Sequence, residues 1–464
     1  MLSPWISASE LRELVIKREV SPREVADFFI ARTEKLNPRL GAFMTIAPQH
    51  AAADAERIAK MSPEQARQCP LYGVAYSLKD LTWTKDLRTT MGSKNYENFI
   101  PPVDTDYVVK LRNAGGILLG KTATPEFGGR PTTEGGLCPP ARNPWNLAHT
   151  AGGSSGGAAA AVAAGLGPLA EGSDGGGSIR IPSACCGVVG LKPSRGRISY
   201  SPIAGEAWAG FATSGSIGRT VKDVAIMLDV MHGPTIGDPY WAPAPATTFE
   251  AAVLAPPPRK LRIGMIAKTS TAKVDPETVA ALESAAKTFE SMGHRVEPLD
   301  VDPAAILADA VSRLIVAGVA STPVENPELM DPVVRATWQA GQNVTASEYI
   351  NVVMQMHNLA REVIQKLHPY DAIITPTLSR PAVKLGSLPS SPEKFEELFE
   401  WLPFTFPFNA TGQPAFSLPN GFSKDGLPIG LQIVGRPADE LTIIGLAAQF
   451  EQARPWKDKH PQLD

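Results

Sequence analysis

The chain has 464 residues, 43% of them hydrophobic and 20% charged, which is an ordinary composition for a globular protein. Its net charge of −3 gives no reason to expect a nucleic acid or an anionic membrane as partner. The opening Met1-Leu2-Ser3-Pro4-Trp5 lacks the basic and apolar regions of a signal peptide, and no apolar run reaches the length of about eighteen residues typical of a membrane span. We therefore expect a cytoplasmic protein without a membrane partner. Its cysteines are expected to be reduced thiols at Cys69, Cys138, Cys185 and Cys186.

The first part of the chain is predicted to be helical. Two capping-box patterns, Ser7-Ala8-Ser9-Glu10 and Ser21-Pro22-Arg23-Glu24, mark the starts of two helices. Asn37-Pro38 is predicted to end the second of them, because proline disrupts a helix interior. A short strand at 42–46 and an alanine-rich helix at 49–60 should follow.

Strands and helices then alternate with tight glycine turns, a pattern typical of a parallel α/β sheet. Strands are expected at 73–78, 117–120 and 184–191, and helices at 107–113 and 222–231. The stretch from 232 to 259 is rich in proline and alanine and is predicted to be a surface linker. A second βα portion should follow, with strands at 261–266, 295–299, 371–375, 415–418 and 429–434, and helices at 276–292, 303–368 and 438–453.

These elements show no clean domain boundary. We predict a single α/β domain, residues 1–464, with a mixed, mostly parallel twisted β-sheet covered by helices on both faces. Within it, residues 1–65 are interpreted as helical N-terminal cladding and residues 73–231 as the core. Residues 260–464 are the second βα portion, which we expect to shape a pocket.

Two glycine-rich loops that carry serine flank a short alanine-rich segment. The first is Gly152-Gly153-Ser154-Ser155-Gly156-Gly157, and the second is Asp174-Gly175-Gly176-Gly177-Ser178-Ile179-Arg180. Glycines let backbone N–H groups approach a ligand, and serine hydroxyls among such groups suggest acyl transfer with an oxyanion hole. No histidine lies in this stretch, and the nearest candidate base of another kind is Lys79, at the end of strand 73–78. A lysine can act as a base where burial lowers its pKa.

Together these segments resemble the amidase signature family of serine hydrolases, over roughly residues 21–453. The other matching segments are Gly120-Lys121-Thr122, Pro125-Glu126-Phe127-Gly128, Asn143-Pro144-Trp145, 187–193 and 425–432. The family often has Thr-Asp-apolar-Gly-Gly-Ser where this chain has Ser173-Asp174-Gly175-Gly176-Gly177-Ser178. The resemblance implies the same single α/β domain, with 73–231 as its signature core.

By motif matching, the resemblance implies a Ser–cis-Ser–Lys triad: Ser178 the nucleophile, Ser154 the cis-serine that relays protons, and Lys79 the base. The oxyanion hole is expected from the backbone N–H groups of Gly175, Gly176 and Gly177. Supporting roles around the triad are expected for Ser155, which should also cap the alanine-rich helix, and for Asp174 and Arg180. Walls of the substrate pocket are expected from Trp83, Phe127, Gly128, Gly129, the helices after 303 and the loop 404–408.

Three other interpretations stay open. Residues 152–156 also fit the nucleophile elbow of an α/β-hydrolase-type esterase, with Ser154 as nucleophile and an aspartate and a histidine later in the chain. The candidate histidines are His232, His294, His357 and His368. The glycine loops could instead form a phosphate-binding module, although no P-loop spacing is present. The chain could also be an amidotransferase A-type subunit that needs a partner, but the basic segment of that subunit is not found near 331–336.

The resemblance favours a serine amidohydrolase that cleaves the C–N bond of a carboxamide through an acyl-enzyme on Ser178. The expected pocket walls are apolar, which favours a hydrophobic or aryl amide, with carbamates or esters as related substrates. No cofactor and no metal are expected, because the seven histidines lack ligand spacing. The expected partner is therefore a small-molecule amide or carbamate, with no nucleic acid, and a homodimer is compatible with the sequence.

Overall fold

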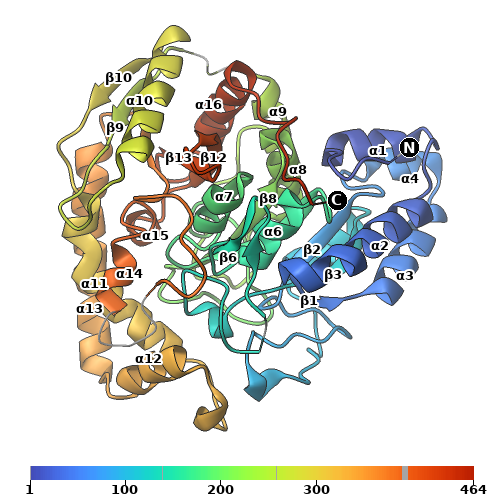
Figure 1. Ribbon diagram of the computed structural model, residues 1–464, viewed down its shortest axis with the longest axis horizontal. Helices are drawn as coiled ribbons and strands as arrows, with labels where there is room; N and C mark the ends of the chain where they lie inside the picture. The colour runs from blue at the N-terminus through green and yellow to red at the C-terminus, as the bar shows by residue number, and fades with distance from the viewer. Residues whose placement is uncertain (1, 138, 256, 258, 389–394, 464) are drawn as a thin grey trace.

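The computed structural model describes residues 2–137, 139–255, 257, 259–388 and 395–463, so the predicted thiol of Cys138 lies outside the described residues. One large sheet runs through the described part of the chain (Figure 1). Its strands are β1 (Phe43–Ile46), β2 (Ala75–Lys79), β3 (Ile117–Thr122), β6 (Leu169–Asp174), β7 (Val189–Lys192), β8 (Thr213–Gly218), β9 (Arg262–Met265), β10 (Arg295–Pro298), β11 (Ala372–Pro376), β12 (Ala415–Phe422) and β13 (Pro428–Gly435). A separate hairpin pairs β4 (Arg142–Asn143) with β5 (Asn146–Thr150).

The strand order across the sheet is β1-β3-β2-β6-β8-β7-β12-β13-β11-β9-β10. Parallel pairs form two groups, β3-β2-β6 and β11-β9-β10. The pairs between these groups, and the edge pair β1-β3, are antiparallel. The sheet is therefore mixed, as predicted, but among the described residues its six antiparallel pairs outnumber the four parallel ones, so it is not mostly parallel. Its first parallel group contains the strand that ends at Lys79.

Helices cover both faces of the sheet, which confirms the predicted α/β class (Figure 1). One hydrophobic cluster includes residues of α2 (Pro22–Leu40), α3 (Pro48–Ala59), α6 (Gly156–Ala163), α7 (Arg180–Cys186), α11 (Pro303–Ala320), α13 (Ala346–Leu367) and α15 (Pro407–Ala410). The other includes residues of α5 (Asp106–Asn113), α8 (Val221–Met231), α9 (Phe249–Leu254), α10 (Pro276–Ser291) and α16 (Glu440–Ala453). The remaining helices are α1 (Ala8–Ile16), α4 (Pro63–Gln68), α12 (Pro332–Gln342) and α14 (Phe395–Phe399).

The predicted end of the second helix was wrong. Helix α2 continues through Asn37-Pro38 to Leu40, and Gly41 ends it with a left-handed φ of 62°. Pro38 lies in the last turn, and although it removes one helical backbone donor, the helix continues for two more residues. Glycine adopts the left-handed conformation without the steric penalty of a Cβ, so Gly41 rather than Pro38 sets the boundary.

Two further local predictions need correction. The apolar run 184–191 is not one strand, because α7 extends to Cys186 and β7 begins only at Val189. A short apolar run fits a buried helix and a buried strand equally well, so periodicity cannot separate them. The expected linker 232–259 contains helix α9, and its residues Pro256 and Pro258 lie outside the described residues.

In the described part of the chain, α11 alone is long and apolar enough, by composition, to cross a membrane. Asp309 and Arg313 interrupt its apolar residues, so the sequence of α11 contains no unbroken apolar run of eighteen residues. Its buried residues, among them Leu307 and Leu314, belong to the hydrophobic cluster on one face of the sheet. The apolar character of α11 is therefore explained by packing inside the protein.

Candidate active site

Lys79 and the second glycine loop lie at the same end of two neighbouring strands of the large sheet. Strands β2 and β6 are parallel neighbours, with Tyr76 opposite Leu169 and Ser77 opposite Ala170. Lys79 is the last residue of β2, and Asp174 is the last residue of β6. Because the carboxyl ends of parallel strands meet at one edge, Lys79 is placed beside the start of the second glycine loop.

Lys79 is completely buried and makes side-chain hydrogen bonds to two serines. Its Nζ donates to Ser154 Oγ at 2.7 Å and to Ser173 Oγ at 3.0 Å. Burial lowers the pKa of Lys79 to about 7, although the nearby carboxylates of Glu171 and Asp174 act in the opposite direction. The amine can therefore be neutral near neutral pH, as a lysine base requires.

The first glycine loop holds Ser154 against Lys79. The peptide bond between Gly153 and Ser154 is cis, as the family resemblance implies, and Ser154 is only 2% exposed. A Cβ on Gly153 would lie 2.6 Å from the backbone of Thr132, so this position has no room for a side chain. The lack of a side chain at Gly153 therefore allows close packing against Thr132 rather than the approach of a ligand. This argues against the interpretation of the loop as a phosphate-binding module.

Ser155 links the two glycine loops. Its backbone N–H donates to the carbonyl oxygen of Ser178 at 3.1 Å, and its hydroxyl donates to the carbonyl of Ser173 at 3.1 Å. Ser155 stands at the N-cap of α6, but its side chain makes no capping hydrogen bond. The expected capping role is therefore corrected, because the hydroxyl bonds to the β6 strand instead.

The second glycine loop carries Ser178, which is partly exposed and lines two cavities. The Gly177 N–H donates to Asp174 Oδ1 at 2.7 Å, and the Gly176 N–H reaches the same oxygen only at 3.4 Å. In the described part of the chain, no group accepts from the N–H of Gly175 or of Ser178. Of the three glycines expected to supply the oxyanion hole, Gly177 is thus already bonded inside the protein.

A buried ion pair supports this loop from below. Arg180 Nη2 lies 2.9 Å from Asp174 Oδ1, and both side chains are completely buried. Burial opposes ionisation of Asp174, but the guanidinium of Arg180 outweighs it and holds the pKa of Asp174 well below its usual range. Asp174 and Arg180, the two charged residues for which the sequence predicts supporting roles, are thus paired with each other beneath the loop.

Three polar residues in this support were missed by the sequence analysis. Asn409 accepts from Arg180 and donates to Asp174, Gln432 accepts from Arg180, and the Thr405 hydroxyl donates to the Gly176 carbonyl at 2.7 Å. All three lie in apolar segments near the C-terminal end of the chain. Buried polar groups require partners, so isolated polar residues inside such segments are the signal that could have found them.

Glu171 was also missed. It is completely buried on β6 and accepts from the Lys79 backbone N–H at 2.9 Å and from the Thr82 hydroxyl at 2.8 Å. Burial raises the pKa of Glu171, while these hydrogen bonds act to lower it. Asp80, in contrast, contacts Thr90 rather than Lys79. The sequence signal that could have found Glu171 is a charged residue inside a buried strand that leads into a glycine loop.

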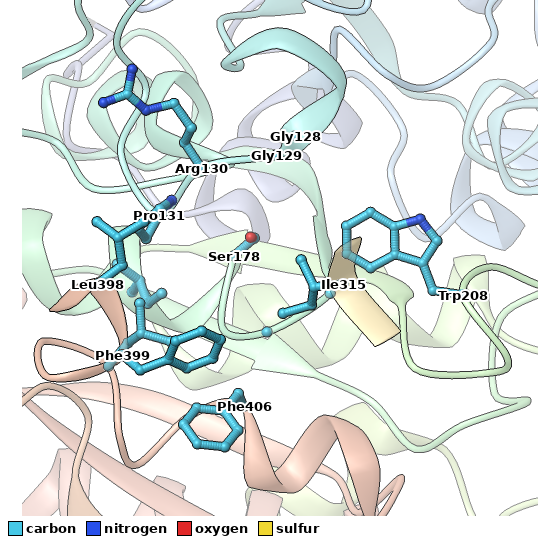
Figure 2. Close-up of a pocket in the computed structure, with 14 residues that line it drawn as sticks. Gly128, Gly129, Arg130, Pro131, Ser178, Trp208, Ile315, Leu398, Phe399 and Phe406 are labelled. Atoms are coloured by element: carbon cyan, nitrogen blue, oxygen red, sulfur yellow. The ribbon is translucent and has the colours of Figure 1, made fainter. Parts of the chain in front are cut away.

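The two cavities that meet at Ser178 differ in size and lining. The smaller one, of about 60 Å³, is walled mainly by apolar side chains that include Ile181, Ile315 and Phe406 (Figure 2). The larger one, of about 370 Å³, also reaches Ser154. Among the expected wall residues, Gly128 lines both cavities, Gly129 lines the smaller, and Trp83 and Phe127 line the larger.

None of the histidines proposed for the nucleophile-elbow interpretation lines either cavity. His294, for example, accepts from the Leu261 backbone N–H, and His232 packs against Phe249. Cys69, Cys185 and Cys186 are free thiols. Within the described ranges, no group of three His, Cys, Asp or Glu residues is placed to hold a metal ion.

Comparison with known proteins agrees with this arrangement. The family model described as amidase matches residues 24–444. An acylamidase of Rhodococcus erythropolis is 36% identical over 98% of this chain and 97% of its own length. A 6-aminohexanoate-cyclic-dimer hydrolase of Paenarthrobacter ureafaciens is 36% identical over 99% of this chain and 97% of its own length. A solved bacterial aryl acylamidase of the amidase signature family superposes with a TM-score of 0.87 and 30% identity, covering 98% of each chain.

The chain therefore belongs to the amidase signature family, and it is a hydrolase that acts on amide C–N bonds. This membership favours neither the α/β-hydrolase-type esterase nor the phosphate-binding module.

Proposed function

We propose that the protein cleaves a carboxamide through an acyl-enzyme on Ser178. The Ser178 hydroxyl attacks the carbonyl carbon while its proton passes to Ser154 and a proton from Ser154 passes to neutral Lys79. As the C–N bond breaks, Ser154 returns a proton to the leaving amine and regains one from Lys79. Water then hydrolyses the Ser178 ester by the same relay, releasing the acid and restoring the serine.

The observation that carries this proposal is the 2.7 Å hydrogen bond between Lys79 Nζ and Ser154 Oγ at a completely buried lysine. Burial lowers the pKa of Lys79 to about 7, close to that of a general base at neutral pH. Ser178 alone among the proposed triad opens onto both cavities, which suits the nucleophile better than the buried Ser154 does.

For the oxyanion hole we propose the backbone N–H groups of Gly175, Gly176 and Ser178. The first and third have no acceptor within the described chain, and the second is held only by a long bond to Asp174. Such donors stabilise the negative charge that develops on the carbonyl oxygen, and one of them typically contributes about 100- to 1000-fold in rate.

The apolar walls of the smaller cavity support a hydrophobic or aryl amide as substrate. A carbamate or an ester presents a carbonyl to the same nucleophile and is included as a secondary substrate class. The names acylamidase and aryl acylamidase, borne by two relatives, are compatible with this choice. We further propose that the protein acts without a partner subunit, unlike an amidotransferase A-type subunit.

The test combines labelling with turnover of butyranilide by the purified chain. A serine-directed fluorophosphonate should modify Ser178, and Ser178→Ala should abolish labelling and turnover while leaving the melting temperature unchanged. Labelling at Ser154 in the unmodified enzyme would favour the nucleophile-elbow interpretation. Turnover that appears only after addition of a partner protein would favour the amidotransferase interpretation.

A further inference from the structure

We propose that the two cavities meeting at Ser178 are separate subsites: the smaller accepts the acyl group and the larger accepts the amine. This inference rests on the acyl-enzyme proposed above. It defines the substrate class as the amide of a short, uncharged acyl group with a bulky aromatic amine. The supporting observations concern the position of Ser154, the linings of the two cavities, and the largest residue that they share.

The position of Ser154 assigns the leaving amine to the larger cavity. Both Ser154 and Ser178 line that cavity, whereas only Ser178 lines the smaller one. When the tetrahedral intermediate collapses, the C–N bond breaks and its electron pair goes to nitrogen, which takes a proton from the Ser154 hydroxyl. The nitrogen must therefore lie on the Ser154 side, and the acyl substituent extends into the other cavity.

The smaller cavity limits the acyl group. Its volume is about 60 Å³. A buried water needs about 10–15 Å³ on a comparable measure, so the space suits an acyl chain of about four to six atoms. Ile181, Ile315 and Phe406 supply apolar walls, and Figure 2 shows Ile315 near the Ser178 side chain and Phe406 farther from it.

Among the described residues, Arg130 is the charged one that lines this cavity, and it does not offer a binding site for a charged acyl end. Its guanidinium lies 3.8 Å from Asp331, and Figure 2 shows the side chain directed away from Ser178. Burial of an unpaired charge among apolar side chains is costly, so charged acyl groups are disfavoured.

The larger cavity offers aromatic and hydroxyl groups to the amine. Trp83 and Tyr107 supply ring surface, and hydroxyls come from Thr82 and Ser214. The Tyr107 hydroxyl lies 3.1 Å from Thr82 Oγ1 and 3.2 Å from Ser214 Oγ, so these polar groups are held in place by one another. Ring surface with a few fixed polar groups suits an aromatic amine better than ammonia.

Trp208 has the largest side chain of the residues that line both cavities, a position that it shares with Gly128, Gly175 and Ser178. Its ring lies between Gly175 on the nucleophile loop and Gly318 on α11. A Cβ on Gly175 would approach the ring to 3.1 Å, and a Cβ on Gly318 to 2.8 Å. The two glycines thus create the space that the indole occupies, and α11 thereby helps to position a wall that both subsites share.

The experiment uses two substrate series and a matched pair of variants. The acyl series comprises acetyl, butanoyl and octanoyl anilides, and the amine series comprises the butanoyl amides of ammonia, aniline and 2-naphthylamine. Ile315→Ala enlarges only the smaller cavity, and Ile203→Ala enlarges only the larger one. Values of kcat/KM are measured for each series, together with fluorophosphonate labelling of Ser178.

The unmodified enzyme should prefer butanoyl over octanoyl anilide and the aromatic amines over ammonia. Ile315→Ala should raise the octanoyl-to-butanoyl ratio at least about tenfold, the discrimination typical of one methylene in an apolar pocket, and leave the amine series unchanged. Ile203→Ala should change only the amine series. Trp208→Ala should make the preference in one series depend on the group occupying the other cavity.

The subsite proposal would be overturned if Ile315→Ala changed the amine series and Ile203→Ala the acyl series, or if both variants changed both series equally. Labelling of Ser178 in the same enzyme would still support the acyl-enzyme. A protein that turns over these amides without labelling at Ser178 would instead contradict the acyl-enzyme, and with it the inference built on it.

Discussion

Lys79 Nζ lies 2.7 Å from Ser154 Oγ, although the two residues are 75 positions apart in the chain. Strand β2 brings Lys79 to the edge of the sheet, and the first glycine loop brings Ser154 to the same place. Because the lysine is completely buried, its protonation state depends on its surroundings more than on its ordinary pKa of about 10.4. Most of the predictions below follow from this contact and its neighbours.

We expect kcat/KM for an anilide to rise as the pH increases through about 7, the value to which burial lowers the pKa of Lys79. Below that pH the amine is protonated and cannot accept a proton from Ser154. In Lys79→Ala, kcat/KM should no longer rise with pH and should be at least about 100-fold lower, as expected for loss of a general base. The exposed Lys85 provides the control, because Lys85→Ala should leave both kcat/KM and its rise with pH unchanged. If kcat/KM of Lys79→Ala still rose with pH through about 7, Lys79 would not be the base.

Glu171→Gln should move the rising limb toward lower pH. The negative charge of Glu171 raises the pKa of Lys79, so its removal lets burial lower that pKa further. Glutamine retains an oxygen to accept from the Lys79 N–H and from Thr82. Asp80→Asn is the matched control, since Asp80 contacts Thr90 instead. Identical midpoints in the wild type and Glu171→Gln would show that Glu171 does not act on Lys79.

Ser154→Ala should impair amide hydrolysis more than ester hydrolysis. A leaving amine needs a proton, whereas p-nitrophenolate leaves without one. We expect a loss of about 100- to 10,000-fold for butyranilide, in the range of general acid–base catalysis, and a loss at least tenfold smaller for p-nitrophenyl butyrate. Steady-state kinetics on the two substrates measure the difference. Equal losses would mean that Ser154 does not protonate the leaving group.

Gly177→Ala should destabilise the protein, whereas Gly176→Ala should not. Gly177 has a φ of 130°, and a Cβ there would overlap the Thr405 hydroxyl. We expect a loss of about 1–3 kcal/mol in the free energy of unfolding from the strained backbone conformation. A Cβ on Gly176 meets no atom within 4 Å, so its effect should stay within about 0.5 kcal/mol. Urea unfolding of the two variants compares them directly, and equal stabilities would refute the strain at Gly177.

Far from the site, Glu451→Gln should stabilise the protein above neutral pH. Burial raises the pKa of Glu451 to about 7 in the folded state, from an ordinary value of 4.5. The folded state therefore binds more protons than the unfolded state between these values, so stability falls as the pH rises through this window. Glutamine removes the cost of ionising the buried carboxyl and keeps an acceptor for the Val221 N–H.

The gain from Glu451→Gln should be about 1–3 kcal/mol at pH 8 and should shrink toward zero near pH 4. Denaturant unfolding at both pH values tests this, with Glu283→Gln on the exposed side of α10 as a control that should show no such dependence. A gain independent of pH would mean that Glu451 ionises normally in the folded protein.

The sequence by itself was sufficient for the local elements and for the motif that identifies the family. Capping boxes, glycine turns and apolar runs are properties of neighbouring residues, so strands such as β2 and helices such as α10 could be predicted closely. The failures were also local: Pro38 sits in the last turn of α2, and the run 184–191 changes from helix to strand at Gly187. At the end of α2 the left-handed Gly41 sets the boundary, and in the run 184–191 a short apolar stretch fits a buried helix and a buried strand equally well.

Only the tertiary structure decided which residues surround the motif. Glu171 approaches Lys79 because β6 pairs with β2, and Asn409 reaches Asp174 across a separation of 235 residues. Ile315 joins the small cavity because α11 packs against Trp208, in a cluster that also contains Phe127. Contacts of this kind leave no local pattern in a single chain, because their free energy comes from burial and hydrogen bonding between segments that meet only when the sheet has formed.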